Sequence, residues 1–454
     1  MELIQPSILS GFMELSPEDQ VLFNQMKAIV EKHFQAYGFW PLDTPAIEKT
    51  EVLFSKGGGE TAKQVYRIER SDHSADQALR FDLTVPLARY VAQHSQELSF
   101  PFRRYQIAKV WRGERSQKGR YREFYQADID IIGRDQLGLL NDAEIPSVID
   151  HIFQDLGLEG LVFHINHRAL LNGFFQMIGV KDLEETLRAI DKLSKIGEAG
   201  VGDILRETGL SEEGITRIFD FITSCPSNEE TLNKLHRLEA EKETNEAYRQ
   251  GLSDLTRVYE AMQQFGIDPE RIRIDLSITR GLDYYTGMVY ETFIQGHESI
   301  GSVCSGGRYD DLASNFSKEK FPGIGISIGL TRLFYQLQAA DLISWGQGDY
   351  LKALVIPMSE EEEPAAIKVV NQLRKVGLSS QLYSESGKMK KKFSYADRIQ
   401  AAFVVIIGGE ERAAGLVSLK NLKTGDQERL SLDEAIERIR QASSKEALIE
   451  KQAE

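Results

Sequence analysis

The period of the apolar positions changes along this chain, and each change predicts a different kind of element. Over residues 17–37 apolar side chains recur every three to four positions, and Pro17 stands where a first helical turn would begin. This pattern predicts an amphipathic helix that ends near Gly38. From about residue 60 to residue 135 the period shortens to two, as expected for strands with one apolar face.

Three segments alternate between apolar and polar residues: LRFDLTV (79–85), YREFYQADIDIIG (121–133) and RIRIDLSITR (271–280). Each is expected to form a strand with one face on a core. The polar face of the first would carry Asp82 and Thr84. Half-polar strands suit an antiparallel sheet whose second face lines a wet groove, so these polar faces predict a functional site.

Residues 166–270 return to the helical period, which predicts a helical subdomain inserted between the strands. SWGQGD is then typical of a linker. From about Tyr350, strand and helix patterns alternate over LKALVIPM, EEPAAIKVVNQLRKVG, SSQLYS and AAFVVIIGG. This order predicts a small α/β domain at the C-terminal end.

The charge of the chain is uneven. With 454 residues it is long enough for roughly two to four domains. Its 54 Lys and Arg against 69 Asp and Glu give a formal net charge of −15, which argues against a general nucleic-acid-binding surface. Residues 351–454 carry 17 basic and 16 acidic side chains, so a polyanion would meet less repulsion there.

Cysteine, histidine and leader patterns exclude several classes of protein. Cys225 and Cys304 are far apart and form no CxxC pair, so neither a disulfide framework nor a thiolate zinc site is expected. The eight histidines show no HExxH pattern, and we expect no metal ion held by the protein alone. No signal peptide and no apolar run of roughly 20 residues is recognisable. We therefore expect a soluble, cytoplasmic protein.

The window PFRRYQIAKVWRGERSQKGRYREFYQ (101–126) holds eight basic residues and two acidic ones. Arginine forks bind phosphate oxygens through paired hydrogen bonds. A strand carrying Arg112 and a returning strand carrying Phe124 and Gln126 would therefore hold a polyphosphate and its base. The alternative is a solvated basic hairpin without a ligand.

Two further windows contain glycine beside reactive side chains. In ITRGLDYYTG, Arg280 precedes a tight turn, and Tyr284 and Tyr285 follow it. Arg, Asp and Tyr together suit a small zwitterion, and a packed turn is the structural alternative. In CSGGRYD, Gly306 and Gly307 are expected to form a turn that lets the backbone approach a ligand closely.

The segment GIGISIGLTRLF (323–334) places glycines on one face of a strand and Arg332 in the first turn of the next helix. This pattern predicts a flat ligand against the strand, with close helix packing as the alternative. There is no GxxxxGK[ST] and no GxSxG, which argues against a P-loop ATPase and an α/β-hydrolase. The lysines of GKMKKKFSYADR are expected on a solvated face that an RNA backbone would also suit.

Together these windows resemble the class II aminoacyl-tRNA synthetases and, more specifically, the histidyl-tRNA synthetase family. FRRYQIAKVWRGERSQKGRYREFYQADIDIIG resembles that family's motif 2, RGLDYYTG and CSGGRYD its histidine signatures, and GIGISIGLTRL its motif 3. The helix leading to Thr44 and Pro45 resembles motif 1. KKFSYADRIQAAFVVIIGGEE resembles the family's anticodon-binding domain.

The resemblance implies an α+β fold with an antiparallel six-stranded catalytic sheet flanked by helices, a helical insertion, a C-terminal α/β anticodon-binding domain, and a homodimer joined through motif 1. The implied boundaries are a catalytic domain over 1–169 and 251–342, the insertion over 170–250, a linker over 343–349, and the anticodon-binding domain over 350–454.

The resemblance also implies two reactions. The carboxylate of L-histidine would attack the α-phosphate of ATP, which brings Mg²⁺ with it, to give histidyl-adenylate and pyrophosphate. The 3′ end of tRNA(His) would then accept the histidyl group.

Residue by residue, Arg112 and Arg280 would be catalytic, acting on the α-phosphate. The ATP site would contain Arg112, Glu114, Arg120, Phe124 and Arg332. The histidine site would contain Asp82, Thr84, Gln126, Asp130, Tyr284 and Tyr285. Arg115, Gln117 and Lys118 would contact tRNA.

The chain departs from the family pattern at residues 11–14, where GFME replaces a GTRD-like turn, and at Ser116, where proline is frequent. Two alternatives stay open. One is the regulatory paralogue of ATP phosphoribosyltransferase, which resembles the catalytic core and normally lacks an anticodon-binding domain. The other is a prolyl or threonyl enzyme of class II, against which RGLDYYTG argues.

Overall fold

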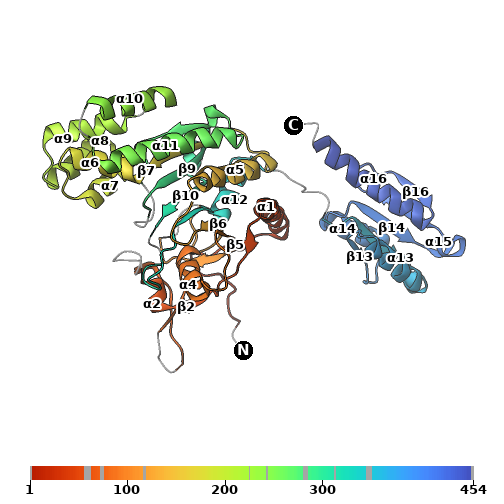
Figure 1. Cartoon of the computed structure of the whole chain (residues 1–454). Coiled ribbons are helices and arrows are strands. Elements are labelled where there is room, and N and C mark those ends of the chain that lie inside the picture. Colours follow the sequence, from red (N-terminus) through yellow and green to blue (C-terminus); the bar gives the residue numbers. More distant parts are fainter. Residues whose placement is uncertain are drawn as a thin grey trace. The chain divides into compact units, whose positions relative to one another are not determined.

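The computed structural model describes residues 3–55, 63–71, 76–115, 119–223, 225–241, 244–279, 285–310, 313–343 and 350–450. The chain divides into two compact units, of which the first ends at Ile343 and the second contains Ser344–Glu454 (Figure 1). Each unit is built on its own β-sheet. Residues 344–349 of the predicted linker lie outside the described part of the chain.

The main sheet of the first unit has eight strands in the order β1-β5-β6-β11-β10-β9-β7-β8. These are β1 (Trp40–Pro41), β5 (Phe102–Trp111), β6 (Glu123–Ile132), β7 (Leu161–His167), β8 (Ile272–Ile274), β9 (Met288–Ile294), β10 (Cys304–Tyr309) and β11 (Gly323–Ile328). The six strands from β5 to β7 pair antiparallel, and β1 and β8 pair parallel at the two edges. The predicted six-stranded antiparallel sheet is confirmed, with a short parallel strand added at each edge.

The alternation predicted around residues 121–133 is confirmed in β6. This strand pairs with β11 so that Asp128 lies opposite Ser327 and Asp130 lies opposite Gly325. The apolar face of β6 is fully buried from Ala127 onward, and the two aspartates on the other face are nearly inaccessible as well. The strand therefore carries buried charge directly beside the core.

The strand predicted for LRFDLTV is wrong beyond its first residue. β4 covers Gln77–Leu79, and α4 follows over Thr84–His94. Asp82 Oδ1 accepts hydrogen bonds from the N–H groups of Thr84 (3.1 Å) and Val85 (2.9 Å). A carboxylate here satisfies the free N–H groups at the start of a helix, and this local effect outweighs the alternation.

The strand predicted for RIRIDLSITR is also shorter than expected, because β8 ends at Ile274. Asp275 Oδ1 accepts hydrogen bonds from the N–H (3.0 Å) and the hydroxyl (2.6 Å) of Ser277. Such a side-chain turn stops the strand.

The turn predicted at Gly306 and Gly307 is wrong, because both residues lie within β10. A Cβ atom at Gly306 would stand 2.1 Å from the carbonyl oxygen of Gly325. These glycines therefore let neighbouring chain segments lie close together.

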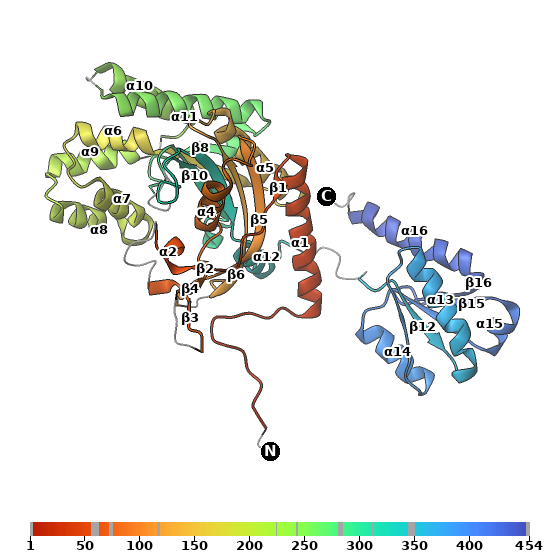
Figure 2. The same ribbon diagram turned by 60° about the horizontal axis from the view of Figure 1, so that its bottom comes forward.

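The helix predicted for residues 17–37 is confirmed as α1 (Pro17–Ala36). It lies along the sheet (Figure 2), where the Phe23 ring is 5.4 Å from that of Tyr125. The first unit also contains α2 (Thr50–Leu53), α5 (Leu140–Asp155), α12 (Leu330–Ala339), η1 (Pro269–Arg271), η2 (Glu298–Ile300), and a small sheet of β2 (Ile47–Lys49), β4 and β3 (Arg67–Ile68).

A group of helices gathers at one end of the first unit (Figure 1). It comprises α6 (Arg168–Met177), α7 (Leu183–Asp191), α8 (Leu193–Glu207), α9 (Glu212–Ile222), α10 (Asn228–Glu241) and α11 (Glu246–Gln264). α6 and α11 pack closely, since a Cβ atom at Gly251 would lie 2.4 Å from the backbone nitrogen of Leu170.

The second unit has a five-stranded sheet in the order β13-β12-β14-β15-β16. Its elements are β12 (Ala353–Pro357), η3 (Glu360–Glu362), α13 (Glu363–Lys375), β13 (Ser380–Leu382), α14 (Met389–Arg398), β14 (Phe403–Ile407), α15 (Gly409–Ala414), β15 (Val417–Asn421), β16 (Gln427–Leu430) and α16 (Leu432–Glu450). β13, β12 and β14 are parallel, as the predicted α/β pattern requires. The pattern did not predict β15 and β16, which pair antiparallel.

The solvated face predicted for the lysine cluster is wrong for one member. Lys392 on α14 is buried, and its Nζ donates to the carbonyl oxygen of Pro357 at 2.6 Å. The same nitrogen lies 5.5 Å from the centre of the Tyr383 ring. Within the described ranges, no helix is long and apolar enough to cross a membrane.

Candidate active site

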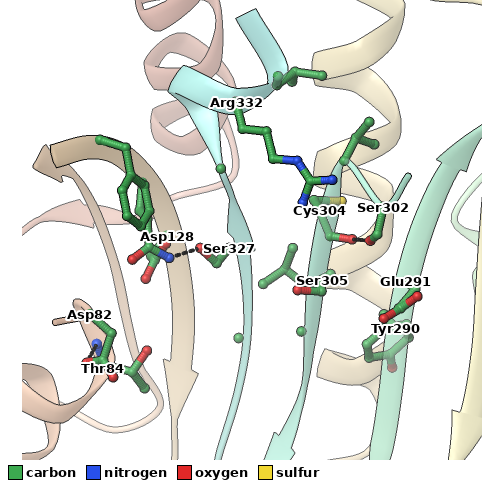
Figure 3. A pocket seen from close by; sticks show the side chains of 18 of the residues that line it. Asp82, Thr84, Asp128, Tyr290, Glu291, Ser302, Cys304, Ser305, Ser327 and Arg332 are labelled. Atoms are coloured by element: carbon green, nitrogen blue, oxygen red, sulfur yellow. Dashed lines mark hydrogen bonds between the residues drawn. The ribbon is translucent and has the colours of Figure 1, made fainter. Parts of the chain in front are cut away.

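A cavity of about 460 Å³ opens on the polar face of the main sheet. Side chains from β6, β9, β10, β11 and the start of α12 surround it (Figure 3). Ten of the predicted site residues line it: Asp82, Thr84, Arg112, Glu114, Arg120, Phe124, Gln126, Asp130, Tyr285 and Arg332. The fold thus brings together windows that are far apart in the sequence.

Of the five other predicted site residues, only Arg115 is described, and it does not line this cavity. Arg280, Tyr284, Gln117 and Lys118 lie outside the described residues. Arg115 is described, and it is exposed on the loop that follows β5.

Arg112 directly follows β5 and lies between two aromatic rings. Its guanidinium carbon is 4.5 Å from the ring centre of Phe81 and 5.1 Å from that of Phe124. Its Nε donates to the carbonyl oxygen of Phe81 at 3.2 Å. These contacts hold the guanidinium group, whose paired N–H donors suit phosphate oxygens, next to an aromatic face that suits a nucleobase.

Two more arginines reach the cavity from other elements. Arg332, in the first turn of α12, donates from Nη2 to the carbonyl oxygen of Ile300 at 3.2 Å. Arg120 lies 4.0 Å from the carboxylate of Glu114. Three guanidinium groups around one cavity suit a ligand with several phosphate groups.

The part of the cavity around β6 and the start of α4 carries oxygen acceptors. Asp82 and Thr84 stand at the start of α4, and Gln126 on β6 donates from Nε2 to Ser327 Oγ at 2.7 Å. Burial raises the pKa of Asp82, while the N–H of Val85 and the charge of Arg112 oppose that shift. This side of the cavity suits a ligand that carries N–H donors.

Asp130 belongs to a buried ion pair that sequence reasoning missed. Its Oδ2 lies 2.6 Å from Nη2 of Arg104, and its Oδ1 accepts a hydrogen bond from the hydroxyl of Tyr309 at 2.9 Å. Burial raises the pKa of Asp130, and Arg104 opposes the shift. Arg104 stood in the basic window, but its partner is on a neighbouring strand, which no local pattern reveals.

The glycine face predicted on β11 is present, and it makes room for side chains. A Cβ atom at Gly323 would lie 2.3 Å from the ring of Tyr309. One at Gly325 would lie 2.1 Å from Oδ1 of Asp130. The glycines therefore accommodate the buried network, and Gly325 also lines the cavity.

Several cavity residues were not predicted as site residues. They include Asp128, Tyr290, Glu291, Ser302, Cys304 and Ser305 (Figure 3). The sequence pattern could have identified Asp128 as a site residue, because it lies on the polar face predicted for residues 121–133. No sequence pattern marked the residues on β9, because that strand is buried on both faces and shows no alternation.

Cys304 is not a nucleophile in this setting. Its Sγ donates to Oγ1 of Thr292 at 3.0 Å, and burial raises the pKa of the thiol to about 12. Among the described residues, no group of three or more His, Cys, Asp and Glu side chains is arranged to hold a metal ion.

Comparisons with known proteins agree with this geometry. Residues 11–333 match the family model for histidyl-tRNA synthetase, and residues 352–442 match that for an anticodon binding domain. A histidine–tRNA ligase of Clostridium tetani is 51% identical over 442 residues, which span 97% of this chain and 99% of that protein. One of Finegoldia magna is 49% identical over 96% of this chain and 100% of that protein.

A solved structure extends the likeness to three dimensions. The crystal structure of histidyl-tRNA synthetase from Nostoc sp. PCC 7120 has a TM-score of 0.88 to this chain at 39% identity, covering 97% of this chain and 100% of that one. The anticodon-binding match also supplies the part that the regulatory paralogue normally lacks. Because the likeness spans nearly the whole chain and both matched families stand in the predicted order, this chain belongs to the histidyl-tRNA synthetase family.

Proposed function

We propose that this chain is a histidine–tRNA ligase, which activates L-histidine with ATP and transfers it to the 3′ end of tRNA(His). The observation that carries the proposal is the single cavity in which ten motif residues of this family meet. Arginine side chains and oxygen acceptors line this same cavity, and Arg112 lies close enough to Asp82 for its charge to oppose the rise in the pKa of Asp82. ATP and an amino acid would therefore bind with their reacting groups next to each other.

In the first reaction the carboxylate of histidine attacks the α-phosphate of ATP, and pyrophosphate leaves. Arg112 would hold the α-phosphate from one side and Arg280 from the other. Negative charge grows on the phosphate oxygens as the new bond forms, and preorganised guanidinium groups oppose it. Arg332 would bind the γ-phosphate, and Phe124 would stack on adenine with Arg120 and Glu114 nearby.

Mg²⁺ is proposed to enter with ATP rather than to reside in the protein. It would neutralise phosphate charge when bound. Glu114 and Glu291, which line the cavity, offer the carboxylate oxygens that magnesium prefers.

On the amino-acid side, Asp82, Thr84 and Gln126 would bind the α-ammonium group. Asp130 and Tyr285, with Tyr284 close in sequence, would select the imidazole. Asp130 already has Arg104 and Tyr309 as partners, and its remaining lone pairs would accept the imidazole N–H, a donor that an analogue without it does not supply.

In the second reaction the 3′-hydroxyl of the tRNA takes the histidyl group from histidyl-adenylate, and AMP leaves. Arg115, Gln117 and Lys118 would contact the tRNA near the cavity, and the second unit would bind the anticodon. We also propose a homodimer formed through motif 1, a cytoplasmic location, and a helical insertion over 170–250 between the two parts of the catalytic domain, 1–169 and 251–342.

Pyrophosphate exchange with each of the twenty amino acids tests the proposal. Exchange should depend on histidine alone, and the same protein should charge tRNA(His). Exchange with proline or threonine instead would assign another class II enzyme. Exchange with no amino acid, in a folded protein that binds ATP, would point to the regulatory paralogue.

A further inference from the structure

Asp128 is a cavity residue to which the family motifs above assign no role. It stands on β6 between Gln126 and Asp130, on the same face of the strand. Figure 3 shows its side chain at the cavity near that of Ser327. Its side chain is buried, with 3% of the residue exposed. No donor among the described residues reaches its Oδ1. An acceptor buried without a donor is destabilising, so this arrangement requires an explanation.

The neighbours of Asp128 on the adjoining strands have other partners. Gln106 lies opposite it on β5, and the Gln106 amide donates to Oδ1 of Asp43 at 2.7 Å. Ser327 lies opposite it on β11; its hydroxyl oxygen accepts from Gln126 at 2.7 Å, and its hydroxyl group lowers the pKa of Asp128 through a hydrogen bond to that carboxylate, whose Oδ1 is still left without a donor. Neither neighbour therefore satisfies Oδ1 of Asp128.

A second buried acceptor stands two residues earlier on the same strand face. Because the Nε2 of Gln126 donates to Ser327, the amide oxygen of Gln126 is left as an acceptor. That oxygen also has no donor within the described chain. Two adjacent acceptors facing one cavity call for a ligand that brings at least two N–H donors.

The charges around Asp128 favour a cationic ligand. Asp130 and Asp82 lie close enough to raise its pKa, whereas the charge of Arg104 and the hydroxyl of Ser327 lower it. Arg104 is shared with Asp130, whose Oδ2 lies 2.6 Å from its Nη2. Arg80 also lies within its electrostatic reach, but its Nε donates to the carbonyl oxygen of Lys109. Burial is the largest cause of a shift that raises the pKa of Asp128 to about 7. A bound cation would return this carboxyl group to its charged form.

We propose that Asp128 is a further substrate-positioning residue, whose carboxylate accepts a hydrogen bond from the α-ammonium group of the bound amino acid together with the amide oxygen of Gln126. An ammonium group carries three N–H donors on one atom, whereas an imidazole nitrogen offers at most one. The third donor remains for Asp82 or Thr84 at the start of α4. The inference rests on the proposed function, since it takes the amino acid as the occupant of this side of the cavity.

The first test removes the charge of Asp128 and, separately, the ammonium of the ligand. Asp128→Asn keeps the shape of the side chain and should weaken the binding of histidine and of histidinol roughly 10- to 100-fold. Imidazolepropionate, which has no amino group, should bind to parent and variant equally well. In pyrophosphate exchange, the Michaelis constant for histidine and the inhibition constants for histidinol and imidazolepropionate measure these effects, and the Michaelis constant for ATP should stay within about twofold.

The matched control is Asp150→Asn, which makes the same change at a buried carboxylate outside the cavity, where Asp150 is paired with Arg271. Its Michaelis constant for histidine should not change. Equal weakening of imidazolepropionate in Asp128→Asn would place Asp128 against the imidazole, and unchanged binding of all three ligands would make it structural. Either result overturns the proposal.

A second test needs no variant. The affinity of the parent protein for histidinol should rise with pH through about 7, because the ammonium binds the ionised carboxylate. The affinity for imidazolepropionate should lack this rise, although its imidazole titrates like that of histidinol. Identical pH profiles for the two ligands would contradict the proposal. A parent protein without histidine-dependent exchange would instead contradict the proposed function, so the two failures are distinguishable.

Discussion

The two sheets of this chain treat buried charge in opposite ways. In the second unit, β12 and β14 are apolar and buried at every position, and helices cover the core on both faces. In the first unit, the neighbouring strands β5 and β6 bury Arg104, Asp128 and Asp130, and the two aspartates line the cavity. Apolar burial stabilises a fold directly, whereas buried ions must be paired or bound to a ligand. The first sheet is therefore less stabilised by burial in return for carrying a ligand site, whereas the apolar strands of the second sheet have no such cost.

The largest effect is expected where one buried ion loses its partner. Asp130→Asn leaves Arg104 uncompensated and should lower the free energy of unfolding of the first unit by about 3 to 5 kcal/mol. It should also raise the Michaelis constant for histidine, because the amide donates as well as accepts. Calorimetry and exchange kinetics measure the two effects separately.

A double variant sharpens this prediction. Adding Arg104→Met to Asp130→Asn removes the buried positive charge that has lost its partner. The double variant should recover part of the lost stability, but not the affinity for histidine. If Asp130→Asn alone were as stable as the parent protein, the contrast between the two sheets would not rest on buried charge.

The next effect separates chemistry from stability in the first unit. Arg112→Ala should slow adenylate formation by about 10² to 10³, the usual loss for one preorganised donor, with little change in thermal unfolding. Arg112→Lys should recover only part of the lost rate, because a lysine ammonium group is a point charge without the paired N–H donors of a guanidinium group. Single-turnover adenylate formation measures the rate. Arg134→Ala is the matched control, since Arg134 stacks 4.7 Å from the centre of the Phe100 ring, outside the cavity.

A smaller effect is expected at the buried cation of the second unit. Lys392→Met leaves the carbonyl oxygen of Pro357 without its donor and should destabilise that unit by about 1 to 3 kcal/mol. Pyrophosphate exchange should be unaffected. A loss of exchange equal to the loss of stability would show that the two units do not act separately in the first reaction.

The smallest effect lies on the surface of the first unit and depends on pH. The hydrogen bond from His33 (2.8 Å), with a further contact from Lys32, lowers the pKa of Asp155. Because the folded pKa is below the ordinary value of about 3.9, the stabilisation is present above that value and is lost as pH falls through the folded pKa. Between about pH 2 and 5, the unfolding midpoint of Asp155→Asn should depend less steeply on pH than that of the parent protein. An unchanged profile would show that this exposed contact contributes nothing.

The sequence predicted elements best where one physical effect dominates. The period of two located β6 because its apolar face is fully buried. It failed at Asp82, where a hydrogen-bonding carboxylate starts a helix within an alternating segment. β16 was missed because QERL has no apolar face to reveal it.

The candidate site was predictable to the extent that its residues lie in contiguous motifs. Arg112 and Phe124 could be paired because one hairpin carries both. The ion pair of Arg104 with Asp130, and the glycine that makes room for it, depend on the register between strands. A one-dimensional pattern does not contain that register.

The carboxylate of Asp82 has a consequence for how the specificity of this protein can be redesigned. It accepts hydrogen bonds from the first N–H groups of α4 and also faces the cavity. A library that varies position 82 to accept histidine analogues therefore also varies the start of a helix. Productive variants should be confined to short side chains with an acceptor oxygen, such as Asn, Ser and Thr. Analogues with an altered amino group are thus expected to be accommodated through changes at Gln126 and Asp128, whose strand does not depend on their side chains for its backbone hydrogen bonds.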